Sequence, residues 1–346
     1  IARSGEVVRS GIPLPRSLDV RNPDTLTLVD SGGTPVPAEF QILARWDAGR
    51  DADAPIQWLL VTFPAGVTAN GSATYRLVTD GSAGPNPEPS VAISVTQNGN
   101  QITVDTGAAT FILGGGPGAL FDEIRLRDGA RLVSGSALTA RANSADVSHP
   151  TTRRVAIEHV GPLAAIVVIE GAYDLPPVGD GVLGSRRRYV FTAGSPTAIV
   201  RHAVHWEGDL CGLDSRTCDG SPNGVRVQKV RNALTLDLVL PLAVMAVGDF
   251  ESSAVEGNVK AGQEAWVRQQ LRASRTEPLA FDVSVPGTGG ATGEKADGGM
   301  LAVGNSSGAV VLALNHMHRY EPQALRLLTD GRLAVDVSDD QVWLGA

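Results

Sequence analysis

Hydrophobic and polar residues alternate with a period of two along most of this 346-residue chain. The alternating runs are rich in β-branched and aromatic side chains, and short gaps containing Gly, Pro, Asn or Asp separate them. The clearest runs are 57–63, 90–97, 101–113, 164–173, 187–193, 197–208, 234–242 and 308–318. Because strands without intervening amphipathic helices form antiparallel sheets, the pattern predicts an all-β protein.

One segment, residues 261–274, fits both the helical period and the strand period. The stretch AGQEAWVRQQLRAS, residues 261–274, has the length and composition of a helix. Its Ala265, Val267 and Leu271 can also alternate as in a strand. The sequence therefore leaves helix and strand open for this segment.

A proline-rich stretch divides the chain. Residues 81–90, GSAGPNPEPS, contain three prolines with Gly, Ser and Asn, and such a segment does not continue a sheet. The length of the chain also exceeds that at which one core usually keeps growing. We therefore expect a small N-terminal β-barrel over residues 1–82 and a large antiparallel β-sandwich over residues 90–346.

Charge and hydropathy narrow the classes of partner. The net charge of −8 argues against nucleic acid, which requires a concentrated basic surface. The run Arg186–Arg188 is a local exception, and we interpret it as the solvated end of a strand. No apolar run reaches the roughly 18–20 residues of a membrane span, so no span is expected.

The two cysteines indicate a cellular location. Cys211 and Cys218 flank six residues, among them Gly, Asp and Ser, which form a loop that a disulfide could close. Two cysteines without further ligands do not form a zinc site. A disulfide favours an exported protein, extracellular or at the cell surface.

The stretch LNHMHRYEP, residues 314–322, contains the first candidate site. If the strand at 308–318 continues through it, His316, His318 and Tyr320 share one face, and Arg319 lies on the other. Histidine and tyrosine can act as base and acid, and arginine can neutralise a carboxylate. The alternative is a strand that emerges from the core into solvent.

The stretch RHAVHWEG, residues 201–208, contains the second. His205 and Glu207 fall on one face of a strand, with His202 and Trp206 on the other. His205, Trp206 and Glu207 could bind a sugar. The alternative is that His202 or Trp206 belongs to the core and that His205 and Glu207 form a surface pair.

Metal sites receive little support. Neither histidine cluster has a third ligand at the spacing of a zinc site. Asp122 and Glu123 could contribute to a Ca²⁺ site, although calcium takes about six to eight oxygen ligands. The sequence requires no cofactor, and Ca²⁺ is the one metal that stays open.

Several phrases resemble a known family. They are GIPLPR, VPAEFQILARW and WLLVTF in the first eighty residues, and HVGPLAAIVVIEG further on. They are similar to the N-terminal barrel and the following β-sandwich of exo-type rhamnogalacturonan lyases and their bacterial relatives. The resemblance implies an extracellular protein that acts by β-elimination on rhamnogalacturonan or a related uronate polymer.

The resemblance covers the two β-domains and not the helical toroid that follows them in that family. The chain is therefore expected to be a polysaccharide lyase-like protein or only its non-catalytic N-terminal portion. Two alternatives stay open: a carbohydrate-binding module without catalysis, and a structural surface or fibre protein that self-assembles through exposed sheet edges. The residues do not specify the polysaccharide, the metal dependence or the oligomeric state.

Overall fold

The fold is seen in a computed structural model that describes residues 1–116, 118–142, 149–175, 179–206, 225–249, 253–270, 278–319, 323–338 and 342–344. Within these ranges the chain forms antiparallel sheets and three short 3₁₀-helices, and no α-helix. The all-β prediction is therefore confirmed. No helix in the described ranges is long and apolar enough to cross a membrane.

The N-terminal unit, residues 1–82, contains two small sheets. A three-stranded sheet has the order β1 (Arg3–Pro13), β4 (Ile56–Val67) and β3 (Glu39–Arg45), and a two-stranded sheet pairs β2 (Thr27–Val29) with β5 (Arg76–Val78). The 3₁₀-helices η1 (Arg16–Leu18) and η2 (Pro23–Thr25) connect β1 to β2. The two sheets enclose a core of their own, but no hydrogen-bonded strand pair joins them in the described residues. The unit is not a closed barrel, so this part of the prediction is wrong.

A twelve-stranded sheet, here called the large sheet, runs through the rest of the chain. Its order is β20 (Ala291–Gly293), β19 (Phe281–Ser284), β18 (Ala265–Gln269), β23 (Gln323–Leu327), β24 (Leu333–Ser338), β15 (Val225–Leu236), β10 (Arg131–Ala142), β9 (Glu123–Leu126), β8 (Ala109–Leu113), β7 (Gln101–Asp105) and β6 (Ser94–Asn98). The short strand β25 (Val342–Leu344) pairs with β15 beside this path.

Two four-stranded sheets pack on one face of the large sheet. The β12 sheet has the order β11 (Pro150–Val160), β12 (Ala164–Leu175), β13 (Gly179–Thr192) and β14 (Ala198–Trp206). The β21 sheet has the order β17 (Val255–Val259), β16 (Leu242–Val247), β21 (Gly298–Asn305) and β22 (Gly308–Asn315). A last 3₁₀-helix, η3 (Met317–Arg319), follows β22.

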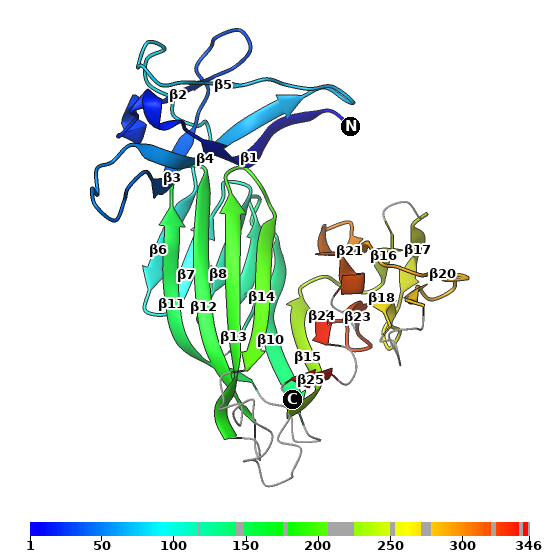
Figure 1. Cartoon of the computed structure of the whole chain (residues 1–346). Coiled ribbons are helices and arrows are strands. Elements are labelled where there is room, and N and C mark those ends of the chain that lie inside the picture. Colours follow the sequence, from blue (N-terminus) through cyan, green and yellow to red (C-terminus); the bar gives the residue numbers. More distant parts are fainter. Residues whose placement is uncertain are drawn as a thin grey trace.

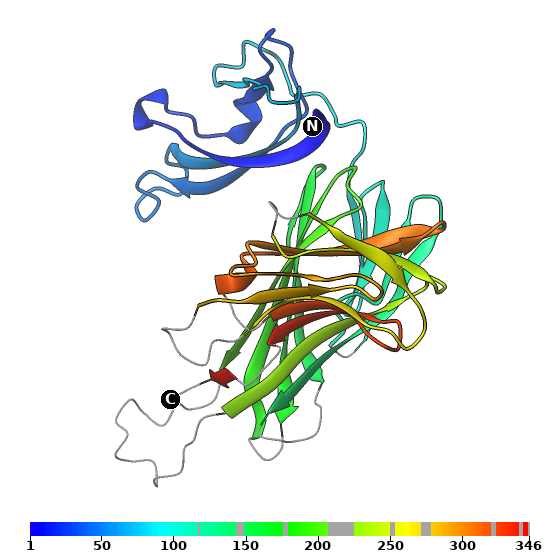
Figure 2. The ribbon, with the colours of Figure 1, turned by 90° about the vertical axis from the view of Figure 1, so that its right-hand side faces the viewer.

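One continuous hydrophobic core lies between the large sheet and both of these sheets. Alternate residues of β12, namely Ala165, Val167 and Ile169, contribute to it, as do Val267 of β18 and Leu301 of β21. Figure 1 shows the green β12 sheet with the blue N-terminal unit at its upper end. Figure 2 shows the yellow and orange strands running across the direction of the green ones. The two sheets therefore cover different stretches of the large sheet.

Strand pairing decides between helix and strand for the segment at 261–274. Residues Ala265–Gln269 form the strand β18, which pairs with β19 on one side and β23 on the other. Its Ala265 and Val267 face the core. The strand expected over 101–113 is two strands, since the chain turns at Gly107, whose φ is +80°.

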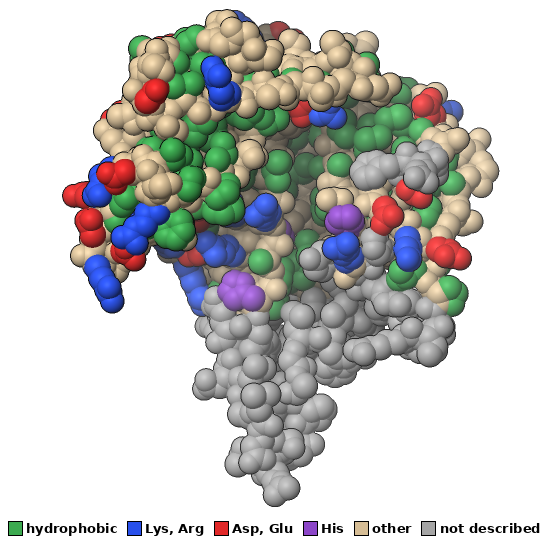
Figure 3. Space-filling model, turned by 45° about the horizontal axis from the view of Figure 1, so that its top comes forward, with side chains coloured by type: hydrophobic (Ala, Val, Ile, Leu, Met, Phe, Trp, Pro, Cys, Tyr) green, Lys and Arg blue, Asp and Glu red, His purple; other side chains and the backbone are tan. Residues whose placement is uncertain are grey.

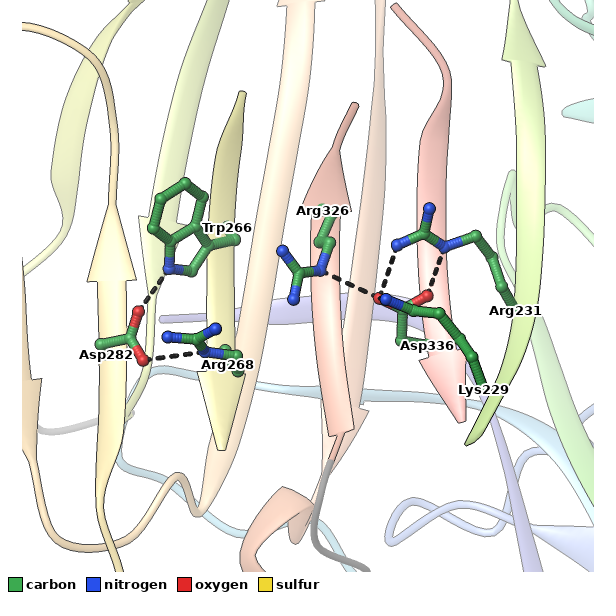
Figure 4. A network of polar contacts seen from close by, with 7 residues as sticks. All are labelled: Lys229, Arg231, Trp266, Arg268, Asp282, Arg326 and Asp336. Atoms are coloured by element: carbon green, nitrogen blue, oxygen red, sulfur yellow. Dashed lines mark hydrogen bonds and ion pairs between the residues drawn. The ribbon is translucent and has the colours of Figure 1, made fainter. Parts of the chain in front are cut away.

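Buried ion pairs tie strands of the large sheet together on the face away from the core (Figure 4). Asp336 of β24 is fully buried, and it accepts from Arg231 of β15 at 2.8 Å and from Arg326 of β23 at 2.9 Å. The Nζ atom of Lys229 lies 3.5 Å from the same carboxylate. In β19, the partly buried Asp282 accepts from the indole N–H of Trp266 and forms an ion pair with Arg268, both of β18. The cationic side chains thus stabilise carboxylates that would be costly to bury alone.

Candidate functional site

The predicted His316–Tyr320 face does not form as an alternating strand. Strand β22 ends at Asn315, and His316 has a φ of +55°. The backbone N–H of His316 donates to Asp297 at 2.8 Å, and Met317 then enters the core with no exposed surface. Arg319 is exposed at the end of η3. Tyr320 and the side chain of His318 lie outside the described residues, so the catalytic role of this stretch stays a prediction.

The second predicted cluster is divided between two faces of β14. His205 is exposed on the outer face of the β12 sheet, and His202 lies on the inner face. His202 is half-buried and is not part of the hydrophobic core, so the alternative that placed it in the core stays a prediction. The side chain of Trp206, all of Glu207 and the cysteines Cys211 and Cys218 lie outside the described residues.

The carboxylates considered for Ca²⁺ have protein partners. Asp122 accepts from the backbone N–H groups of Gly115 at 2.7 Å and Gly116 at 3.1 Å. Glu123 pairs with Arg125 and lies near Arg131. In the described part of the chain, no group of three or more His, Cys, Asp or Glu side chains is arranged to hold a metal ion.

Arginines gather on the outer face of the β12 sheet, here called the arginine face. Strand register places Arg186 of β13 next to Glu170, which in turn faces Arg154 of β11. Two residues further along β13, Arg188 stands directly opposite Arg201 of β14. Figure 3 shows basic side chains gathered near the hollow in this view of the molecule. The face is therefore built by three adjacent strands.

The carboxylates on this face are too few for its arginines. Arg186 lies 3.3 Å from both Glu158 and Glu170. Glu158 also binds Arg188 at 2.6 Å, and Glu170 also binds Arg154 at 3.3 Å. These two glutamates therefore serve three arginines.

Arg201 has no ion pair or side-chain hydrogen bond among the described residues. Like charges directly opposite each other on neighbouring strands are destabilising. The electrostatic potential at Arg188 and Arg201 is therefore positive, and a bound anion would reduce the repulsion between them.

The N-terminal unit adds a fifth arginine. Arg9 of β1 lies near Arg188 and Arg201, and its buried Nε atom has no hydrogen-bond partner. Burial lowers the pKa of the Arg9 guanidinium, the carboxylate of Glu39 opposes that shift, and the charges of Arg188 and Arg201 add to it. Desolvation and like charges thus both make an anion favourable at this end of the face.

The geometry suits repeated carboxylates. A guanidinium binds a carboxylate through two parallel hydrogen bonds, which makes arginine well suited to such groups. Side chains two residues apart on a strand, such as Arg186 and Arg188, are about 7 Å apart, and neighbouring strands are about 5 Å apart. The arginine face therefore presents a grid of cationic groups to a flexible anionic chain.

Sequence reasoning missed this face because it read Arg186–Arg188 as a strand end. The three arginines lie within β13, where Arg186 and Arg188 point outward and Arg187 is buried with 1% of its surface exposed. The expectation of a solvated strand end is therefore wrong for Arg187. The alternation of the flanking residues was the available signal, since it places Arg186 and Arg188 on the face opposite Tyr189.

Comparison of the chain with known proteins assigns it to no family. The chain matches no protein-family model and no curated protein.

Proposed function

We propose that this chain is an extracellular or cell-surface protein that binds an acidic polysaccharide through the arginine face. The observation that carries the proposal is the opposed pair Arg188 and Arg201, because Arg201 has no carboxylate partner among the described residues. Uronate polymers carry one carboxylate on each acidic sugar, which fits a grid of arginines. The exposed His205 lies on the same face and can add a hydrogen bond to a sugar hydroxyl.

A second candidate function is β-elimination on the same polymer. It is supported by the backbone of His316, whose φ of +55° is uncommon for a residue other than glycine, although Asn, Asp and His adopt it more often than other residues. Such conformations cluster at functional sites. His316 would remove the proton beside the uronate carboxylate, and Arg319 would neutralise that carboxylate. The C=C bond would form as the glycosidic C–O bond breaks, and the leaving oxygen would take a proton from water. The resemblance of phrases such as GIPLPR and WLLVTF to rhamnogalacturonan lyases favours the same activity.

The two functions are separated by one titration. The chain is titrated with rhamnogalacturonan and, in parallel, with neutral dextran by isothermal calorimetry, and ultraviolet absorbance reports any unsaturated uronate product. We expect saturable binding to the acidic polymer alone, which weakens as salt is added. We expect Arg201→Gln to raise the Kd about tenfold, because a charge-assisted hydrogen bond is lost.

The matched control is Arg332→Gln, which removes the same charge from an exposed pair with Asp330 at a hairpin of the large sheet. It should leave the Kd unchanged. Equal affinity of wild type, Arg201→Gln and the double variant Arg188→Gln/Arg201→Gln would refute binding at the arginine face. Absorbance that rises with wild type and not with His316→Ala would establish β-elimination, and a flat trace with intact binding would leave a binding protein.

A further inference from the structure

A recess lies between the β12 and β21 sheets. It is a cleft of about 500 Å³ whose sides are the edge strands β14 and β22 and whose floor is the large sheet. Its walls are mostly apolar, and Figure 3 shows a hollow with hydrophobic side chains in its depth. Representative lining residues are Phe121, Leu132, Val200, Leu234, Val311 and Leu312. A concave site with apolar walls and a few polar groups is typical of small-molecule binding.

Four polar side chains line the cleft, namely Thr197, His202, Asn232 and Gln323, and two of them contact each other. The Nδ2 atom of Asn232 lies 3.1 Å from Nδ1 of His202, and Nε2 of His202 lies 3.1 Å from the hydroxyl of Ser185. Asn232 is 2% exposed, and its Oδ1 atom has no hydrogen-bond partner. His202 engages one end of the amide, so either orientation of Asn232 leaves the other end unpaired. The cleft thus contains a buried hydrogen-bonding group without a partner.

A buried positive charge lies beside this pair. Arg187 is directly opposite His202 across strands β13 and β14, and one of its N–H groups donates to the carbonyl of Ala119. The next residue, Leu120, lines the cleft. The Nε and Nη2 atoms of Arg187 have no partner, and no carboxylate in the described residues forms an ion pair with it.

An uncompensated buried guanidinium is costly. Burial and the charge of Arg187 lower the pKa of His202 to about 3, so His202 is neutral near pH 7 and adds no second charge. The potential at the polar end of the cleft is therefore positive.

We propose that this cleft binds an amphipathic carboxylate, with its apolar chain between β14 and β22 and its carboxylate near Arg187, where it accepts from the amide N–H of Asn232 while the Oδ1 atom of Asn232 accepts from His202. The apolar walls disfavour a sugar, and the site is distinct from the arginine face. An added β-strand is also disfavoured, because Figures 1 and 2 show the strands of the β21 sheet crossing the direction of β14. One extended peptide cannot pair with both edges.

The test compares three ligands with the same chain and different head groups. Decanoate, 1-decanol and decylamine are titrated into the full chain near neutral pH by isothermal calorimetry. We expect decanoate to bind about tenfold more tightly than decanol, since its hydrogen bonds are charge-assisted, and decylamine to bind most weakly. Equal affinities for decanoate and decanol, or no saturable binding, would overturn the proposal.

Variants locate the site. Val311 of β22 lines the cleft and is 55% exposed, so Val311→Trp should fill the cleft and weaken all three ligands. The matched control is Ile199→Trp, because Ile199 of β14 is 62% exposed and does not line the cleft. The proposal predicts unchanged affinities for that control. Equal effects of the two tryptophans would place the ligand elsewhere.

Charge variants test the head group. Arg187→Met should remove the preference for decanoate over decanol while decanol still binds. Asn232→Asp places a negative charge in the cleft, so it should reverse the preference in favour of decylamine, and it provides the same test should Arg187→Met fail to fold. Circular dichroism melting confirms that each variant is folded. A decanoate preference that persists in the folded variants would refute the assignment. Neither outcome affects polysaccharide binding, which uses other residues.

Discussion

The pKa of His202 depends on its surroundings in the folded protein. In the sequence this residue is one of six histidines and lies between Arg201 and Ala203. In the fold it faces inward, between Ser185 and Asn232 and opposite Arg187. Burial first, and the charge of Arg187 second, lower its pKa to about 3. In the unfolded chain, the pKa of His202 has its ordinary value of about 6.5.

This shift predicts a pH dependence of stability. Between about pH 6.5 and 3, the unfolded chain binds a proton at His202 that the folded chain does not bind, so stability falls as the pH is lowered through this window. The contribution reaches about 1.4 kcal/mol per pH unit. His202→Asn should reduce the slope of the unfolding free energy against pH, measured by urea denaturation. Ser185→Ala is the control: it removes a hydrogen-bond partner and no titrating group, so it should lower stability and keep the slope. Equal slopes for wild type and His202→Asn would contradict the burial of this ring.

Elements are joined by buried polar contacts as well as by backbone pairing. Asp336 connects β24 to β15 through Arg231 and to β23 through Arg326, and both arginines are largely enclosed. A carboxylate with no exposed surface is tolerated in the sheet because these cations surround it.

Removal of the charge at Asp336 should therefore destabilise the large sheet. We expect Asp336→Asn to lower the free energy of unfolding by about 3 kcal/mol, because partly buried cations lose their shared counter-charge. Chemical denaturation measures the change. The same substitution at Asp330, an exposed residue paired with Arg332 at 2.8 Å, should cost about 0.5 kcal/mol or less. Similar losses at the two positions would show that burial of Asp336 adds nothing.

At the scale of the whole molecule, one carboxylate joins the N-terminal unit to the β12 sheet. Glu39 of β3 contacts the ring of His159 at the end of β11, and it accepts from the backbone N–H of Leu163 at 3.2 Å. Between these residues, Gly161 leaves room for the carboxylate, since a Cβ atom there would collide with it. This contact places Arg9 next to Arg188 and Arg201, so it also completes the arginine face.

Loss of this contact should loosen the two parts. In Glu39→Ala we expect limited proteolysis within residues 81–90 to become several-fold faster and the radius of gyration from small-angle scattering to increase, because the surfaces separate more often. Gly161→Ala should act in the same direction through steric overlap with Glu39. The control is Glu6→Ala, which removes an exposed pair with Arg3 in the same unit. Cleavage at the wild-type rate in Glu39→Ala would show that other contacts hold the two parts together.

The sequence by itself determined the strand content. Period-two patterning and turn residues are local properties, so they predicted β4, β12 and β14 and the all-β class. The same alternation failed where packing intervened. The sulfur of Met317 occupies the space left by Gly299, and the chain turns inward at His316 instead of continuing as a strand.

Only the tertiary structure decided which strands are neighbours. Residue spacing along β13 places Arg186 and Arg188 on one face, but the sequence does not state that Arg201 stands opposite Arg188, or that Arg9 from the N-terminal unit lies near both. The buried contacts of Asp336 and Arg187 likewise join residues far apart in the chain. Alternation fixes the face on which a side chain lies because it acts within one strand. Sheet order and packing between layers depend on the free energy of the whole chain, and so only the folded structure brings the candidate sites together.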